Sequence, residues 1–154
     1  MAETTYDPIL TPTAFYKDPK AALNFLEAAF GFEVVMLIEN PDGGIAHLEM
    51  AYRGAVIGIG GEWEFGPAKM RSPQTLGATT QFIWLSVEKD IEALCERARK
   101  AGAQIAQEPE DQFYGARTFR ALDPEGHVWA FSQTMRSVPQ EEMEKATGLV
   151  WKKG

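Results

Sequence analysis

The chain has 154 residues, 45% of them hydrophobic and 24% charged, which is enough for one compact domain and argues against intrinsic disorder. Its formal net charge of −7 gives no electrostatic attraction to nucleic acid or to an anionic membrane, so we expect neither as a partner. The sequence also shows no apolar run of the roughly 18 residues that cross a bilayer, no signal-peptide pattern, and one cysteine, Cys95. Together these features predict a cytoplasmic protein.

The first half of the chain predicts one helix among short strands. Residues 9–16 are rich in β-formers and predict an opening strand. Asp18 and Pro19 predict the start of a helix, because Asp caps free N–H groups and Pro fits the first helical position, and Gly31 predicts its end. Three further strands are expected over residues 32–39, 45–52 and 55–60.

The second half repeats this order. A strand over 80–87 is followed by a helix that begins at Asp90 and closes at Gly102. Three more strands are expected over residues 104–107, 117–122 and 127–133. Because Asp18 and Asp90 are separated by the same 72 positions as Gly54 and Gly126, we interpret the chain as a duplicated β-α-β-β-β unit.

The segments outside the two units are a linker and a tail. Residues 62–78 contain two X-Pro steps and are expected to form a loop. The tail, 136–154, predicts a short helix with Ser137 as its cap and an end near Gly148. Two interpretations of Trp151 are open: a packing clasp on its own chain, or a lid or dimer contact.

Two sequence motifs in the second half resemble those of a known family. They are Tyr-Gly-Ala-Arg at 114–117 and Asp-Pro-Glu-Gly-His-Val-Trp at 123–129, supported by residues 28–32 and 42–47 in the first half. In this order they resemble the vicinal oxygen chelate superfamily, which includes glyoxalase I, extradiol dioxygenases, fosfomycin-resistance enzymes and bleomycin-resistance proteins. The resemblance implies a single α+β domain in which two tandem βαβββ modules, about 7–61 and 79–135, form a curved mixed sheet around a cavity, with helices on the convex side. It also implies a homodimer.

Metal-dependent members of this superfamily place one ligand on the first and one on the last strand of each module. The corresponding positions here are Thr11, Gly58, Phe82 (or Gln81) and Ala130. These side chains do not supply the several nitrogen or anionic oxygen donors that a divalent ion requires. We therefore expect no metal cofactor.

His47 and Glu49 keep an alternative open, because they alternate onto one face of a strand and such a pair can grip an ion or orient a substrate. With these two residues the chain would be a divalent-metal-dependent glyoxalase-type lyase or dioxygenase. Against this, the repeat pairs His47 with Phe119 and Glu49 with Ala121, which add no donor. The other interpretation is a hydrogen-bonding pair, structural or facing a substrate.

Strand alternation predicts what faces the cavity. Thr11, Thr13, Phe15, Phe82, Trp84 and Ala130 point inward, whereas Trp129 and Phe131 turn outward into the core. An aromatic and mildly polar lining suits a flat organic ligand, although these rings could equally fill the groove themselves.

Five further side chains in the second half have a chemistry that a binding or catalytic site could use. Tyr114 and Arg117 can clamp a carboxylate or phosphate, or Arg117 can pair with a neighbouring acid such as Asp111, Asp123 or Glu125 and fix its loop. Arg120 is expected on the surface or at a dimer contact. His127 is expected to be a turn residue packed near Trp129 rather than a catalytic base, and Cys95 to be buried on an apolar helix stripe.

The resulting hypothesis is a metal-independent protein that binds a small, aromatic or anionic organic molecule between the modules, as a homodimer and without an assigned catalytic residue. Whether it catalyses a reaction stays open, with the balance against it. The candidate ligand-binding residues are Thr11, Thr13, Phe15, His47, Glu49, Phe82, Trp84, Tyr114, Arg117 and Ala130.

Overall fold

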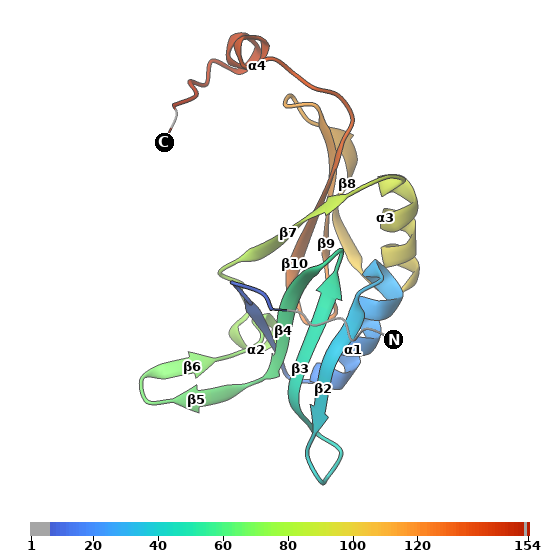
Figure 1. Cartoon of the computed structure of the whole chain (residues 1–154), viewed down its shortest axis with the longest axis vertical. Coiled ribbons are helices and arrows are strands. Elements are labelled where there is room, and N and C mark those ends of the chain that lie inside the picture. Colours follow the sequence, from blue (N-terminus) through green and yellow to red (C-terminus); the bar gives the residue numbers. More distant parts are fainter. Residues whose placement is uncertain (1–6, 153) are drawn as a thin grey trace.

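The computed structural model describes residues 7–152 and 154. The first module contains β1 (Thr13–Tyr16), α1 (Pro19–Phe30), β2 (Glu33–Glu39), β3 (Ile45–Tyr52) and β4 (Ala55–Gly61). The second contains β7 (Phe82–Val87), α3 (Ile91–Lys100), β8 (Gln104–Asp111), β9 (Ala116–Leu122) and β10 (Val128–Thr134). Between them lie β5 (Trp63–Phe65), β6 (Ala68–Met70) and α2 (Pro73–Leu76), and α4 (Gln140–Thr147) follows the second module (Figure 1).

Each module forms one four-stranded mixed sheet, in the order β1-β4-β3-β2 and β7-β10-β9-β8. In both, the first strand pairs in parallel with the last, and the other neighbours are antiparallel. The predicted α+β fold with two βαβββ modules is thus confirmed.

The ends of the two long helices follow the expected signals only in part. The Asp18 carboxylate accepts a 3.0 Å hydrogen bond from the Ala21 N–H, and Gly31 ends α1 in the left-handed region, as predicted. Asp90 precedes α3 without a side-chain cap, and the Ile91 N–H donates instead to Oε1 of Gln133 at 2.9 Å. A residue of β10 therefore caps the first N–H group of α3.

The hydrophobic core runs through both modules. Helices α1 and α3 lie side by side against the sheets (Figure 1), and Phe30 of α1 packs its ring 4.7 Å from Phe131 and 5.6 Å from Trp129. Trp129 and Phe131 are fully buried, as strand alternation predicted. Cys95 is also buried, at 1% exposure. The two modules accordingly share one core.

A tight turn of the second module also fastens it to the first. Asp123 is buried and accepts hydrogen bonds from the Tyr16 hydroxyl at 2.6 Å and from Nε1 of Trp129 at 3.1 Å. Glu125, two residues on, accepts from the backbone N–H groups of Lys17 and Asp18 at 2.6 and 3.0 Å. These contacts fix the end of β1 relative to β10.

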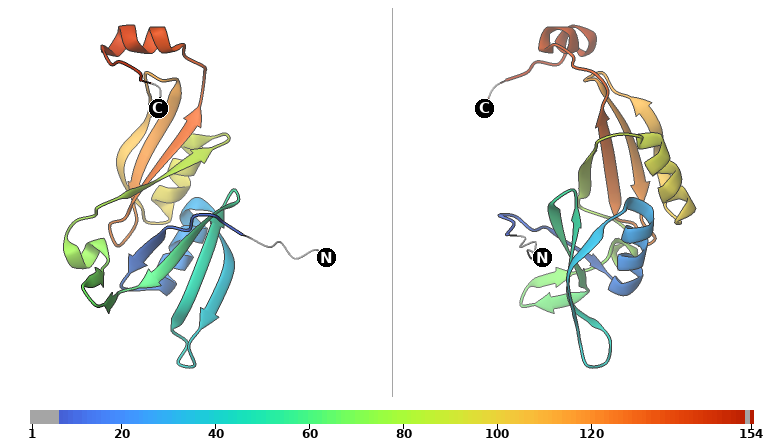
Figure 2. Two further views of the ribbon diagram at one scale, coloured as in Figure 1. Left: turned by 60° about the vertical axis from the view of Figure 1, so that its left-hand side comes forward. Right: turned by 45° about the vertical axis from the view of Figure 1, so that its right-hand side comes forward.

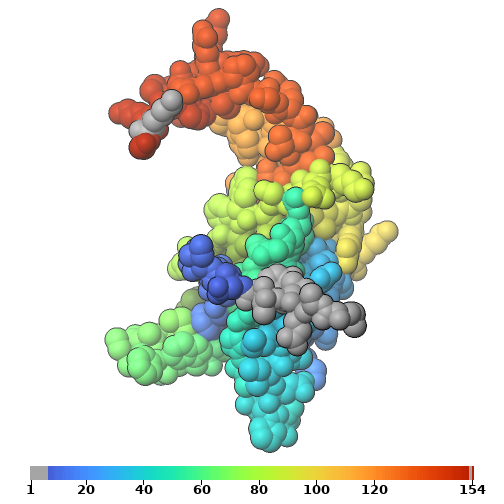
Figure 3. All heavy atoms as spheres, viewed as in Figure 1, coloured from blue at the N-terminus to red at the C-terminus, as the bar shows by residue number. Residues whose placement is uncertain are grey.

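The opposite faces of the two sheets are left uncovered by helices (Figure 2). At one end the β5–β6 hairpin projects beyond this open side, and at the other end the tail arches over it, so the space-filling surface is hollowed between them (Figure 3). The molecule is a crescent whose concave side carries the inward-facing positions of both sheets.

Three expectations need correction. The linker is not an irregular loop: residues 63–70 form a hairpin and α2 follows, capped by the Ser72 hydroxyl. The opening strand begins at Thr13, and Thr11 lies before it. The tail helix ends at Gly148 as expected, but it begins after Pro139 and Ser137 does not cap it.

Candidate functional site

Strand register places the inward positions of the first sheet in one row. Thr13 of β1 is paired with Gly58 of β4, and Gly58 with Glu49 of β3. A Cβ at Gly58 would lie 2.5 Å from Oγ1 of Thr13, so the glycine lets the Thr13 side chain lie flat on the sheet. The residue opposite Gly58 is therefore Thr13. The expectation that Thr11 holds this place on the first strand is wrong, because Thr11 is exposed and precedes the strand.

The second sheet presents an aromatic row with one cation. Trp84 is paired with Ala130, and Ala130 with Arg120. The rings of Phe82 and Trp84 lie 6.2 Å apart, and the Arg120 guanidinium lies 5.8 Å from the centre of the Phe82 ring. Arg120 is exposed, as expected, and belongs to this open face, where it forms a cation–π contact.

The same register corrects the equivalence drawn from the repeat. Glu49 and Arg120 occupy matching places, each opposite an inward residue of the last strand, Gly58 or Ala130. Phe119, which the repeat matched to His47, is fully buried and stacks on Phe131 at 4.8 Å. The shift arises because the β9–β10 connection is longer than the two-residue turn between β3 and β4.

The residues at the superfamily's metal positions do not fit a metal. After the register correction these positions hold Thr13, Gly58, Trp84 and Ala130, which together provide one hydroxyl oxygen. His47 and Glu49 do come together, with Nε2 and Oε1 2.9 Å apart on the exposed face of β3. Within residues 7–152 and 154, no three or more His, Cys, Asp or Glu side chains lie close enough together to hold a metal ion.

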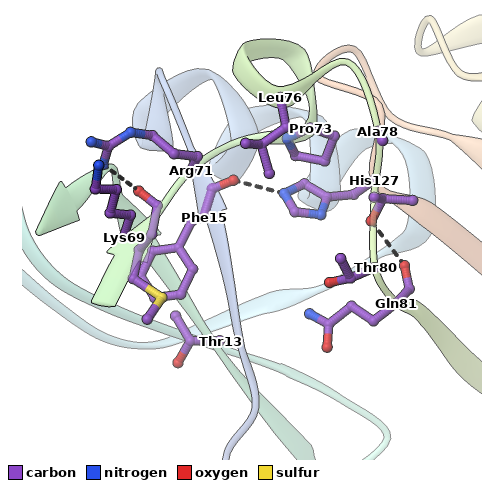
Figure 4. A pocket seen from close by; sticks show the side chains of 12 residues that line it. Thr13, Phe15, Lys69, Arg71, Pro73, Leu76, Ala78, Thr80, Gln81 and His127 are labelled. Atoms are coloured by element: carbon purple, nitrogen blue, oxygen red, sulfur yellow. Dashed lines mark hydrogen bonds between the residues drawn. The ribbon is translucent and has the colours of Figure 1, made fainter. Parts of the chain in front are cut away.

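A pocket of about 380 Å³ lies where β1, the linker and the segment before β7 meet (Figure 4). Thr13 and Phe15 line it from β1, and α2 contributes Pro73 and Leu76. Residues 78–81 close another side with backbone and with polar side chains, including that of Gln81. The pocket combines apolar walls with hydrogen-bonding groups, the usual composition of a small-molecule site.

Two cationic side chains of the linker border this pocket. Arg71 is engaged, since it forms an ion pair with Glu64 and donates to the carbonyls of Trp63 and Met70 at 3.1 and 3.0 Å. Lys69 is exposed and forms no ion pair with the residues that the structure describes. Its ammonium group is therefore available to an anionic ligand.

His127 lines the pocket from the tight turn of the second module. It is a turn residue as expected, but its ring packs at a tilt against that of Tyr16, with ring centres 4.5 Å apart, and its Nε2 lies 2.7 Å from the Phe15 carbonyl oxygen, so it reaches into the first module. Burial raises the pKa of the adjacent Tyr16 hydroxyl well above its usual value, with the Asp123 charge and hydrogen bond adding to the effect. The Tyr16 phenol is consequently a hydrogen-bond donor at neutral pH.

Tyr114 and Arg117 lie away from this pocket. They belong to the end of the sheet near Thr134, about five or six residues along β10 from Phe82, a separation of roughly 17–20 Å. Arg117 pairs with Asp111 at 2.7 Å and with Glu92 of α3, and its hydrogen bond lowers the pKa of the Asp111 carboxyl. Arg117 is thus paired as the loop-fixing alternative expects, and a ligand clamp by Tyr114 and Arg117 stays a prediction.

Some residues of the pocket were missed in the sequence. Lys69 and Arg71 lie in a segment expected to be a loop, where no periodicity marks a direction. The repeated glycines at 58 and 60 were a usable signal, because a Cβ at either would meet Thr13 or Phe15. The pocket role of His127 depends on a contact with Phe15, 112 positions away, and had no local signal.

Two packed βαβββ modules with an open concave face define the class of protein. Consistent with this, residues 8–131 match the family described as Glyoxalase/Bleomycin resistance protein/Dioxygenase superfamily. The chain belongs to this superfamily. Among the described residues, none of the helices is both long and apolar enough to cross a membrane.

Comparison with individual proteins agrees with the family. An uncharacterised protein of Mycobacterium bovis is 30% identical over 141 residues, covering 91% of this chain and 92% of the relative. The crystal structure of TioX from Micromonospora sp. ML1 is similar with a TM-score of 0.68 and 25% identity, covering 84% of this chain and all of TioX. FosX of Listeria monocytogenes, a fosfomycin resistance protein, shares the fold with a TM-score of 0.58 and 16% identity over 92% of this chain and 99% of FosX.

Proposed function

We propose that this protein binds a small organic molecule with an aromatic or anionic group, without a metal ion, in the groove between its modules. The observation that carries the proposal is the pocket of about 380 Å³ beside β1, which joins apolar walls to the available Lys69 ammonium group. Lys supplies the charge that an organic anion requires. The exposed Phe82 and Trp84 rings on the neighbouring sheet offer a stacking surface for a flat ligand.

Calorimetric titration of the full chain with benzoate tests this proposal. We expect saturable binding that the Lys69→Met variant weakens several-fold, because the variant removes the cation but keeps the alkyl stem. Lys145→Met, on the exposed α4, is the matched control and should bind as the unaltered chain does. Equal affinity in both variants would contradict the proposed anion site.

Metal independence is supported by the donor set at Thr13, Gly58, Trp84 and Ala130. The rival function, a divalent-metal-dependent lyase or dioxygenase, rests on the His47–Glu49 pair. Elemental analysis of protein purified without chelators separates the two. We expect less than a tenth of an equivalent of Ni, Zn, Fe or Mn; one equivalent that disappears in His47→Ala would establish the rival.

The assembly we propose is a homodimer in which a second copy covers the concave side. Helix α4 has only eight residues and none is buried, and an isolated helix of this length is marginal in water. Strand β2 is an edge strand that exposes Met36 and Ile38 at 46% and 50%, a surface that proteins normally cover. Glu49 on one sheet and Arg120 on the other have opposite charges at matching positions, so the two faces complement each other between copies.

Light scattering tests the dimer. We expect a mass about twice 17.1 kDa for the full chain, and a shift toward monomer for the Met36→Glu/Ile38→Glu double variant. Glu33→Gln, on the same strand, should stay dimeric. A monomer at every concentration would exclude this arrangement.

A cytoplasmic location completes the proposal, supported by the buried thiol of the single Cys95.

A further inference from the structure

His127 has one ring nitrogen committed to the fold and one that is free. The residue is 6% exposed, and its Nε2 lies 2.7 Å from the Phe15 carbonyl oxygen. A carbonyl only accepts hydrogen bonds, so Nε2 must carry the hydrogen and donate it. The neutral imidazole has a single N–H, and Nδ1 is therefore an acceptor with a lone pair.

The free Nδ1 is not sealed from solvent. Nδ1 forms no hydrogen bond with any residue that the structure describes. Among the described residues, every side-chain nitrogen or oxygen atom that is buried from solvent has a hydrogen-bond partner. Nδ1 is thus reached by solvent, and His127 is one of the residues that line the pocket. Figure 4 shows the second ring nitrogen turned away from the Phe15 carbonyl.

The ring is also held in a fixed orientation. It packs at a tilt against the ring of Tyr16, whose hydroxyl donates to Asp123, and the His127 backbone N–H donates to the same carboxylate at 3.0 Å. An acceptor locked by its neighbours loses little entropy when a ligand arrives, which is the condition for selective recognition.

The other end of the pocket differs in chemistry. Figure 4 shows Lys69 on the far side of Phe15 from His127, so that a cation and an acceptor stand at opposite ends of an aromatic wall. We propose that the pocket selects an organic anion that carries a hydroxyl or N–H group at its other end, with Lys69 receiving the anionic group and Nδ1 of His127 the donor. This inference rests on the proposed binding function and specifies its ligand class.

Three probes of nearly equal shape test the inference: 4-hydroxybenzoate, 4-methoxybenzoate and benzoate. The methoxy compound keeps the ring and carboxylate but lacks the donor. We expect 4-hydroxybenzoate to bind roughly three- to tenfold more tightly than the methoxy compound, the effect of one neutral hydrogen bond. In His127→Phe, the three probes should bind with equal affinity.

Imidazole nitrogen NMR at pH 8 observes His127 itself, so this measurement does not depend on whether the His127→Phe variant folds. The chain has two histidines, so His47→Gln leaves His127 as the sole imidazole. We expect the free protein to show a protonated Nε2 and an unprotonated Nδ1, and only 4-hydroxybenzoate to move the Nδ1 resonance.

The outcomes separate the two proposals. A proton on Nδ1 in the free protein, or benzoate binding with no preference for the hydroxyl probe and no Nδ1 shift, would overturn the role of His127 and leave the binding function standing. Failure of all three probes to bind would overturn both the ligand class and the anion site.

Discussion

The Tyr16 hydroxyl donates a 2.6 Å hydrogen bond to the Asp123 carboxylate, and this contact helps to join β1 of the first module to the tight turn of the second. Both residues are buried, at 1% and 4% exposure. Removing the Tyr16 hydroxyl deprives the buried carboxylate of one of its donors, which costs more than the loss of an exposed hydrogen bond. Tyr16→Phe should therefore lower the free energy of unfolding by about 1–3 kcal/mol.

Urea denaturation of Tyr16→Phe beside Tyr52→Phe measures this loss. Tyr52 is half-buried and its hydroxyl donates to none of the described residues, so its variant should change stability by no more than about 0.5 kcal/mol. If the two variants lose the same stability, the Tyr16–Asp123 bond does not join the modules energetically.

The same tyrosine predicts a loss of stability at alkaline pH. Burial, followed by the nearby Asp123 charge, raises the pKa of Tyr16 above the value near 10 that it has when unfolded. The folded state then holds the proton more tightly, so the stabilisation is complete below about pH 10 and is lost as the pH rises above it. Urea midpoints from pH 8 to 11 should fall more steeply for the unaltered chain than for Tyr16→Phe. Parallel curves would contradict the linkage.

Arg97 forms a second link between the modules through hydrogen bonds from α3 to α1. Its Nε and Nη2 donate to the carbonyls of Ala28 and Glu27 at 2.8 and 3.0 Å, so a residue of α3 caps the last turn of α1. Arg97→Leu should lower the unfolding free energy by about 1–2 kcal/mol. Arg99→Leu, whose exposed pairs with Glu96 and Glu108 are worth less, is the control and should lose under about 1 kcal/mol. Equal losses in thermal denaturation would refute the capping role.

We predict that the path of the tail depends on the absence of a side chain at Gly115. Its φ is +89°, and a Cβ there would lie 2.2 Å from the Arg136 carbonyl oxygen, so Gly115→Ala forces the tail away from the β8–β9 connection. We expect faster proteolysis around residues 135–140 and a loss of roughly 1–3 kcal/mol in stability. Gly43→Ala has a similar φ of +84° with open space around it and isolates the cost of backbone strain alone. Identical cleavage rates in the two variants would show that the tail does not depend on this contact.

Cys95 is predicted to be unreactive in the folded protein. It is 1% exposed, and burial, the largest cause, raises the pKa of its thiol to about 11, so little of the reactive thiolate forms near neutrality. Iodoacetamide at pH 8 should modify it many-fold more slowly in the native protein than in urea. Rapid native labelling would mean that α3 opens readily.

The sequence by itself determined the duplicated fold, because each signal was local. Asp18, Pro19 and Gly31 set the ends of α1 through their own backbone preferences, and alternation along β10 placed Trp129 and Phe131 in the core. The repeat of 72 positions indicated the two modules, and the motifs at 114–117 and 123–129 indicated the family. None of these inferences required knowledge of a contact between distant residues.

Only the tertiary structure decided the site. Strand register placed Thr13 rather than Thr11 opposite Gly58, a shift of two residues on the same face. It also matched Glu49 with Arg120 instead of Ala121, because the longer β9–β10 connection shifts the pairing by one residue, and a shift of one residue exchanges the two faces of a sheet. The pocket brings together β1, the linker and His127, whose partner Phe15 is 112 positions away. Such contacts arise from the packing of the whole chain and leave no periodic trace in the sequence.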